Sequence, residues 1–412
     1  MADSRRLLRA LGTLTLAAAL GACGSGGGDG DAATNGSSAG SGSGSTATAG
    51  SGATGSTGSG GSGTTSGTGS GTGSGSTSSS SVPGTTGGSG GSSPGPAAAA
   101  NVSSGGSLQI TAPSTTYPGG SDESATWRDL NTARVAAGAG WLVQSTELDT
   151  AAAAHSSYLV TNIGSSGHAE DPTKPAYYEA SPASRVAKAG FAASFTAETL
   201  SDFSPQINLQ PLDCAAELLN TVYNAVALLG PATHVGLHGW ATTYSGAQFC
   251  IGLVAAPSNR PEGQVVPAGK MVAYPYDGQT GVVESVNLQV ESPRPSSTAL
   301  PNDLAGTPVI VNVRNADYLN LGMAGSLNAK VTEFQMVDPS SGSVVPAAIL
   351  AHAALQGSGV VLVADAYLPV GTVVLVPLSP LLRGHTYTVS FMATLKDGGP
   401  TLQKSWSFTT RP

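Results

Sequence analysis

The sequence predicts an α+β protein in which a helix-rich domain is followed by an antiparallel β-sandwich, with a long tether ahead of both. The tether is predicted because no aromatic residue precedes Tyr117 and no charged residue lies between Asp31 and Asp122. Apolar residues at helical spacing predict the helix-rich domain over 120–258. Short β-branched runs separated by turn residues predict the sandwich over 262–412.

The first 22 residues are expected to be a secretory signal peptide. Arginines precede an apolar run over 11–20, which is too short to span a bilayer, and the sequence Leu-Gly-Ala-Cys ends at Cys23. This ending resembles a bacterial lipobox, which implies that Cys23 is acylated and anchors the chain in a membrane of the cell envelope. Gly24 after it resembles the sorting signal of an outer-membrane lipoprotein. The alternative is an ordinary signal peptide with a chance cysteine.

Residues 23–105 are expected to be the disordered tether. Gly, Ser and Thr without large apolar groups cannot offset the ~1–2 kcal/mol of backbone entropy lost per ordered residue. A Gly-rich coil of about 80 residues has a root-mean-square span on the order of 50 Å. The tether would therefore hold the folded part well away from a membrane.

The overall charge excludes one class of partner. The chain has a formal net charge of −8 with only 17 Lys and Arg residues, and no basic cluster follows the extreme N-terminus. A protein that neutralises a row of phosphates needs such a cluster. We therefore expect no nucleic-acid partner.

Cys214 and Cys250 are expected to form a disulfide, because an exported chain folds in an oxidising compartment. Closing that loop would stabilise the fold by roughly 3–4 kcal/mol in the chain-entropy model. Two free buried thiols are the alternative.

Two helices are expected to open the helix-rich domain. Asp122 or Ser124 could cap the first, and Ser145 or Thr146 the second. The first helix would end at Gly138 and Gly140 and bury Trp127, Leu130, Val135 and Ala136; the second would bury Leu148, Ala152, His155 and Leu159. His155 is therefore predicted to be a hydrogen-bonded core histidine rather than a catalytic one.

His168 is a stronger functional candidate because it lies in a predicted loop beside acidic residues, between Gly167 and Pro172. Loops held by a rigid scaffold commonly carry function. The alternative interpretation is a solvated turn whose acidic side chains cap the following chain. Composition alone leaves the two interpretations open.

Several short segments, in this order, resemble bacterial domains of the CAP superfamily, which includes cysteine-rich secretory, antigen-five and pathogenesis-related proteins. The segments are 130–134 (LNTAR), 141–142 (WL), 154–159 (AHSSYL), 167–172 (GHAEDP), 185–191 (RVAKAGF), 197–198 (AE), 218–223 (LLNTVY), 228–231 (LLGP) and 235–236 (VG). The resemblance implies an α-β-α sandwich with a cleft lined by two histidines and two acids.

Matched residue by residue, the resemblance places His168 as the first cleft histidine and Glu198 as the first acid. Asn224 stands where the second histidine is expected, and Glu217 is a weak candidate for the second acid. Zinc binding in the family relies on both histidines, and a zinc site needs three or four N, O or S ligands. We therefore expect a cleft that binds a ligand but has no resident metal or other cofactor.

The C-terminal region is expected to form an antiparallel sandwich. Its segments 274–279, 382–387 and 406–410 resemble bacterial Ig-like modules. The predicted strands are 308–313, 360–363, 373–377, 387–391 and 404–410, with a hairpin turn at 397–399. In the last strand Trp406 and Phe408 are expected to point into the core.

Three functions are compatible with these observations. The first is a lipid-anchored envelope protein whose CAP domain binds a lipid or polysaccharide ligand through His168 and Glu198. The second is a hydrolase in which Glu198 polarises His168 as a general base. The third is a structural or adhesive surface protein. The missing nucleophile favours binding, so we expect no enzymatic activity.

Overall fold

The computed structural model describes residues 107–412 except 163, 164, 166, 204–212, 240–247, 296, 297, 302, 321–328 and 354. All of these described residues belong to one compact unit. The predicted signal peptide, Cys23 and the tether lie outside them. Among the described residues, no helix combines the length and apolar character needed to cross a bilayer.

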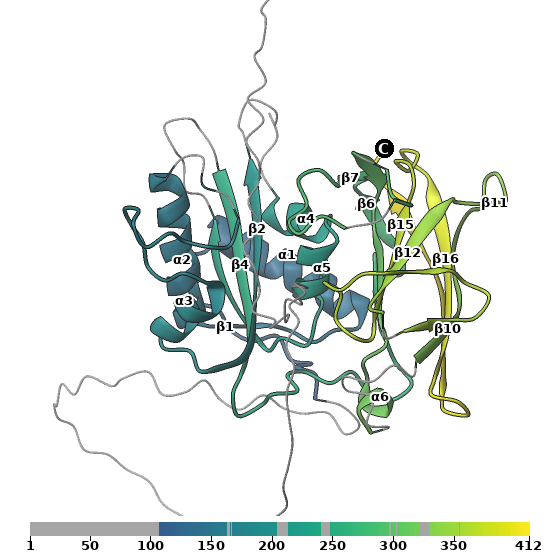
Figure 1. The fold of residues 1–412 in the computed structure, drawn as a ribbon, viewed down its shortest axis with the longest axis horizontal. Helices are drawn as coiled ribbons and strands as arrows, with labels where there is room; N and C mark the ends of the chain where they lie inside the picture. The colour runs from purple at the N-terminus through teal and green to yellow at the C-terminus, as the bar shows by residue number, and fades with distance from the viewer. Residues whose placement is uncertain are drawn as a thin grey trace, which may run out of the picture. The chain divides into compact units, whose positions relative to one another are not determined.

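The helix-rich domain has three layers, with a mixed four-stranded sheet between two sets of helices (Figure 1). The sheet order is β1-β3-β4-β2, so β2 is an edge strand. Helices α2 and α3 cover one face of the sheet, and α1, α4 and α5 cover the other. The elements are α1 (Asp122–Ala137), β1 (Val143–Gln144), α2 (Thr146–Thr161), α3 (Pro182–Lys188), β2 (Ala193–Phe203), α4 (Cys214–Leu219), α5 (Tyr223–Leu228), β3 (His234–Gly239) and β4 (Gln248–Pro257).

The first helix forms where it is predicted, but its cap and its buried face differ from the prediction. Ser121 is the N-cap, and its side chain accepts the Ser124 N–H. Gly138 ends the helix in the left-handed conformation, at φ 96°. Val135 is 43% exposed, whereas Arg134 is fully buried. Ala136, which was also predicted to be buried, is exposed. The burial of Arg134 was not predicted, because a buried guanidinium needs acceptors that the local sequence does not reveal.

The second helix positions His155 as predicted. Ser145 caps α2, and the predicted apolar residues of the helix are buried together with His155. Gly236 of β3 permits the close contact between strand and helix, because a Cβ there would lie 2.1 Å from the Leu148 backbone carbon. The buried face of α2 therefore packs directly against the sheet, and His155 lies inside the protein.

The β domain consists mainly of a six-stranded sheet, β11-β10-β16-β17-β6 with β13 beside β10, and a five-stranded sheet, β14-β12-β15-β9-β5 (Figure 1). A small pair, β7-β8, accompanies them. The elements are β5 (Val272–Tyr274), β6 (Gln279–Val282), β7 (Ser285–Asn287), β8 (Leu304–Gly306), β9 (Val309–Asn312), α6 (Ala316–Asn320), β10 (Ala329–Asp338), β11 (Ser343–Val344), β12 (Ala347–Ala351), β13 (Gln356–Gly357), β14 (Leu362–Ala364), β15 (Thr372–Pro377), β16 (Thr386–Leu395) and β17 (Thr401–Thr410).

The two larger sheets share one apolar core, and Trp406 and Phe408 of β17 point into it as predicted. The 397–399 turn joins β16 and β17 as the predicted hairpin. The expectation of a purely antiparallel sandwich is wrong in one respect. Three pairs in this domain, β10 with β13, β12 with β14 and β17 with β6, are parallel. Short strands that return through longer connections make such pairs possible.

Strand β15 is buried on both faces because it separates two cores. Val373 and Leu375 pack in the core of the β domain, whereas Val374 and Val376 pack in a core continuous with α1, α4 and α5. A run of apolar residues without alternation is typical of a strand covered on both faces. The β domain therefore packs against the helices instead of standing apart from them.

Glu291 connects the β domain to the start of α5. Its carboxylate accepts the Val222 N–H at 2.7 Å, and only 9% of the residue is exposed. Burial raises the pKa of Glu291 to about 7 from its ordinary 4.5, although the backbone N–H groups of Val222 and Tyr223 oppose the shift. A carboxylate here is therefore costly to the folded state.

We expect Glu291→Gln to flatten the pH dependence of stability. A raised pKa means that the folded state holds the proton more tightly than the unfolded chain, so wild-type stability falls as pH rises from about 4.5 to 7. The full loss is at most about 3 kcal/mol. In thermal unfolding, the melting temperature of the variant relative to the wild type should be higher at pH 8 than at pH 5. The control Asp397→Asn, in the exposed hairpin, should leave the melting temperature unchanged at both pH values. An equal gap at both pH values would contradict the assignment.

Candidate functional site

His155 lies at the centre of a buried polar cluster between α2, α3 and β2. Its Nδ1 is 2.9 Å from Glu170 Oε1, and its Nε2 is 3.1 Å from the Gly167 carbonyl oxygen and 3.6 Å from Glu198 Oε1. Both ring nitrogens thus face oxygen acceptors. A doubly protonated imidazolium is the form that donates to both of them. The predicted structural role of His155 agrees with this geometry.

Arg185 supplies the second positive charge of the cluster. Its Nη2 donates to both oxygens of Glu198, at 2.9 and 2.8 Å, and its Nη1 lies 3.5 Å from Glu170 Oε1. The side chains of Arg185, Glu170, Glu198 and His155 are all 0% exposed. Two carboxylates are therefore balanced by a guanidinium and an imidazolium, which is the condition for burying charge without a large penalty.

The loop that carries His168 is held by the same groups. Arg185 Nη2 donates to the His168 carbonyl oxygen at 2.9 Å, and Glu170 Oε2 accepts the Tyr178 N–H at 2.7 Å. The Tyr158 hydroxyl of α2 accepts the Asp171 N–H at 2.9 Å. The loop is thus fixed by buried side chains on both sides of His168.

His168 is the exposed member of the arrangement. Its Nδ1 lies 3.0 Å from Glu198 Oε1, and its side chain is 32% exposed. Because an ionised carboxylate accepts only, Nδ1 carries a proton, and in the neutral ring Nε2 is the nitrogen that keeps its lone pair. No described residue hydrogen-bonds to Nε2. His168 therefore presents Nε2 at the surface in a fixed orientation, as an acceptor when the ring is neutral, and it is supported by a fully buried carboxylate.

Glu198 is held as a carboxylate. Burial acts to raise its pKa, but the hydrogen bond with His168 and the positive charges of His155 and Arg185 outweigh it, so the pKa lies below the ordinary value. The same pairing with Arg185 disperses its negative charge. Glu198 consequently orients the His168 ring through this hydrogen bond.

The two other residues suggested for the cleft lie elsewhere. Asn224 is on α5, and its Nδ2 donates to the Leu200 carbonyl oxygen at 3.2 Å. Glu217 is on α4, where burial and the nearby charge of Asp213 raise its pKa. Within the described part of the chain, no recorded contact joins either residue to His168 or Glu198.

The donors around His168 do not fit a zinc ion. Both nitrogens of His155 and the oxygens of Glu170 and Glu198 are engaged by other groups, so the described residues leave Nε2 of His168 as the available donor. Zinc requires three or four ligands. Across the described residues, no group of three or more His, Cys, Asp or Glu side chains could hold a metal ion.

Glu170 and Arg185 are the members of the cluster that sequence reasoning did not identify as site residues. Both occur in the segments that carry the family resemblance, but neither was given a role. The closest indication in the sequence was Arg185 itself, which is adjacent to Val186; both are buried residues of the short helix α3. A buried arginine needs either an acid or backbone carbonyls as partners, so it would have made Glu198 one candidate.

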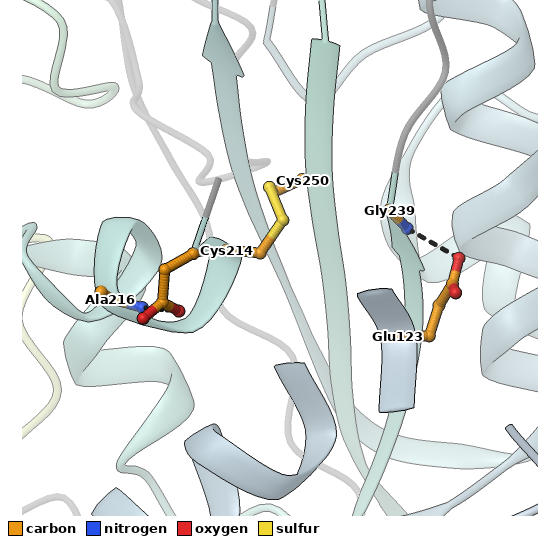
Figure 2. The surroundings of a disulfide bond; sticks show 6 residues. Glu123, Cys214, Ala216, Gly239 and Cys250 are labelled. Atoms are coloured by element: carbon orange, nitrogen blue, oxygen red, sulfur yellow. Dashed lines mark hydrogen bonds between the residues drawn. A yellow bond between two sulfur atoms is a disulfide. The ribbon is translucent and has the colours of Figure 1, made fainter. Parts of the chain in front are cut away.

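The predicted disulfide is present between Cys214 and Cys250, with their Cα atoms 5.7 Å apart (Figure 2). It joins the first residue of α4 to β4 in the centre of the sheet. Asp213 caps α4 by accepting the Ala216 N–H at 3.0 Å, and Glu123 of α1 accepts the Gly239 N–H at 3.3 Å (Figure 2). The disulfide therefore links α4 to β4, and the Glu123 contact links α1 to β3.

Comparison with known proteins gives little guidance beyond this geometry. No family model matches the chain, and no curated protein matches it. Among solved structures, an outer surface protein from Borrelia burgdorferi is similar over 33% of this chain and 93% of its own, at 17% sequence identity and a TM-score of 0.28. The site is therefore interpreted from its own residues.

Proposed function

We propose that the chain is an exported, lipid-anchored protein of the cell envelope whose helix-rich domain is of the CAP type and binds a ligand at His168 without catalysing a reaction. The anchor at Cys23, in the outer membrane, and the tether over 23–105 are proposed from the sequence. The three-layer architecture and the order of the segments support the CAP assignment. The Ig-like character of 262–412 is proposed on the same basis.

The observation that carries the proposal is the state of His168. Buried Glu198 holds the proton on Nδ1, so that the neutral ring presents Nε2 as an acceptor at the surface. Such an acceptor recognises a hydroxyl donor, which both polysaccharides and lipid headgroups provide. Arg185 and His155 neutralise the carboxylates beneath, so the site is rigid before a ligand arrives. Rigid sites lose less entropy on binding.

Binding is favoured over hydrolysis because the dyad lacks the other groups that hydrolysis needs. No serine, threonine or cysteine among the described residues is hydrogen-bonded to His168. A general base also works best when its partner increases its basicity, and the ion pair with Arg185 opposes that. A hydrolase remains the alternative that the following experiment addresses.

His168→Ala is expected to weaken ligand binding at least tenfold while the melting temperature changes little, because His168 is partly exposed. Binding of the purified full chain to a panel of soluble polysaccharides and to vesicles with hydroxyl-bearing lipids would be measured by calorimetry. The two panels distinguish a glycan from a lipid. Arg128→Ala, at an exposed residue of α1, serves as the control.

Two results would overturn this proposal. If the wild type released products from the ligand and His168→Ala did not, the protein would be an enzyme. If the variant retained full affinity for every ligand that the wild type binds, His168 would have a structural role and an adhesive function would be favoured.

A further inference from the structure

Strand β2 has one long edge that is not paired with another strand. Within the described residues, β2 pairs with β4 along its length and no strand lies on its other side (Figure 1). Such an edge presents unpaired N–H and C=O groups that can pair with another extended chain. Proline, lysine and bulges are common protections of an edge, and β2 has none of them from Phe195 to Phe203.

The backbone groups of the even-numbered residues of β2 face this open edge. In an antiparallel ladder, alternate residues direct their backbone groups to opposite sides of the strand. The Leu200 carbonyl oxygen accepts Nδ2 of Asn224 on α5 at 3.2 Å, so it points away from β4. Thr196 and Glu198, which precede Leu200 at the same alternation, therefore direct their N–H and C=O groups to the open edge as well.

The hydrogen bonds of β3 give the same alternation. Leu237 is opposite Gly252 of β4, but it donates its N–H to Asp149 Oδ1 at 2.8 Å. Gly252 therefore turns its own backbone groups to the other side of β4, toward Thr199 of β2, with which it is paired. The odd-numbered residues of β2 thus form the ladder with β4.

The accessible surface agrees with this assignment. Glu198 is only partly buried although its side chain is 0% exposed, so the accessible part of this residue is its backbone. Thr199, whose backbone faces β4, is fully buried. No described residue outside β4 hydrogen-bonds to the backbone of Thr196 or Glu198. The N–H and C=O groups of these two residues are therefore open, at a repeat of about 6.8 Å.

We propose that this edge binds one extended peptide segment of a partner protein, which adds to the sheet beside β2 and pairs with the backbone of Thr196 and Glu198. Donors and acceptors at this repeat are matched by an extended polypeptide, so the backbone chemistry identifies the class of partner. A second copy of the chain fits less well, because so short a ladder buries far less than the about 1,200 Å² of a stable dimer interface. The inference uses only the backbone of β2 and is independent of the ligand proposed for His168.

The first test needs no ligand. Amide hydrogen exchange of the full chain, followed by NMR, should show the N–H groups of Thr196 and Glu198 exchanging at least about tenfold faster than those of Ala197 and Thr199, because only the latter pair with β4. Equal protection of all four amides would overturn the proposal, since the edge would already be covered.

The second test uses a short labelled peptide of alternating threonine and valine with a lysine at each end. Fluorescence anisotropy should show that it binds the full chain, and that methylating its backbone nitrogens weakens binding by at least about tenfold, because the donors to β2 are lost. Binding should protect the amides of Thr196 and Glu198 from exchange. Failure of the unmodified peptide to bind at millimolar concentration, or equal binding of the methylated peptide, would overturn the proposal.

The third test removes one donor from the edge. Thr196→Pro should weaken peptide binding by at least about tenfold and leave the melting temperature near that of the wild type, because a proline is tolerated where the missing N–H faces away from the ladder. Thr196→Val keeps the N–H and should bind as the wild type does. Ala197→Pro removes an N–H that pairs with β4 and should destabilise the fold. If Thr196→Pro were as destabilising as Ala197→Pro, or if it abolished a dimer of the wild type in sedimentation, the proposal would be wrong.

Discussion

Arg185→Met is expected to destabilise the protein by about 3–5 kcal/mol at pH 7, which is the effect of removing one partner from a buried ion pair. The variant keeps the apolar stem of the side chain but leaves Glu170 and Glu198 buried beside each other without the guanidinium. His155 alone cannot balance both carboxylates. Chemical denaturation followed by fluorescence would give the free energy of unfolding.

The loss of stability in Arg185→Met is also expected to depend on pH. In the wild type the pKa of Glu198 is lowered, so its ionisation contributes stability that is present at neutral pH and lost as pH falls below its ordinary pKa of 4.5. Without Arg185 that contribution disappears, because the carboxylates become easier to protonate. The gap between wild type and variant should therefore shrink from pH 7 toward pH 4.

Arg128→Met is the control for this experiment, because Arg128 also pairs with an acid, Asp129, but its side chain is 67% exposed. Exposed ion pairs contribute about 0–1 kcal/mol. If Arg185→Met cost no more than Arg128→Met, the cluster would not be a charged network, and the fixed orientation of His168 would lose its explanation.

Removing the disulfide is expected to have the second largest effect. The double variant Cys214→Ala, Cys250→Ala should lose about 3–4 kcal/mol in the chain-entropy model, because the bond closes a loop with a sequence separation of 36. Both cysteines are buried, at 4% and 1% exposure, so small apolar replacements fit the site. Denaturant midpoints of the variant and the wild type would give the difference.

Two controls isolate the bond itself. Cys23→Ser removes the third cysteine and should leave the midpoint unchanged. Wild type unfolded and refolded under reducing conditions should fall to the midpoint of the double variant. A double variant as stable as the oxidised wild type would show that the link between α4 and β4 is not needed to hold the layers together.

Much of the fold could be predicted from local pattern. The phase of α2, with His155 on its buried side, follows from apolar residues at a period of 3.6, and the alternation of Trp406 and Phe408 follows from the period of a strand. The disulfide followed from compartment and from the small number of cysteines. In each case the residues that decide the structure are neighbours in the sequence or have few possible partners.

The first helix shows where local pattern fails. Its pattern was interpreted with Val135 and Ala136 on the buried side. In the structure both are exposed, and Arg134 is buried instead. The acceptors that permit burial, at Gly140, Leu228 and Gly230, come from two other segments, one of them far along the chain. No window of sequence around Arg134 contains that information.

The candidate site was also predicted only in part. His168 and Glu198 were named from the sequence, with the family resemblance, as were Asn224 and Glu217; the structure brings the first two together and places the others in different contacts. By itself the sequence determined the positions of the first two helices, the buried side of α2 and the disulfide between Cys214 and Cys250. The tertiary structure decided which charges are buried and what balances them, because the free energy of a buried charge depends on partners that meet only when distant segments pack.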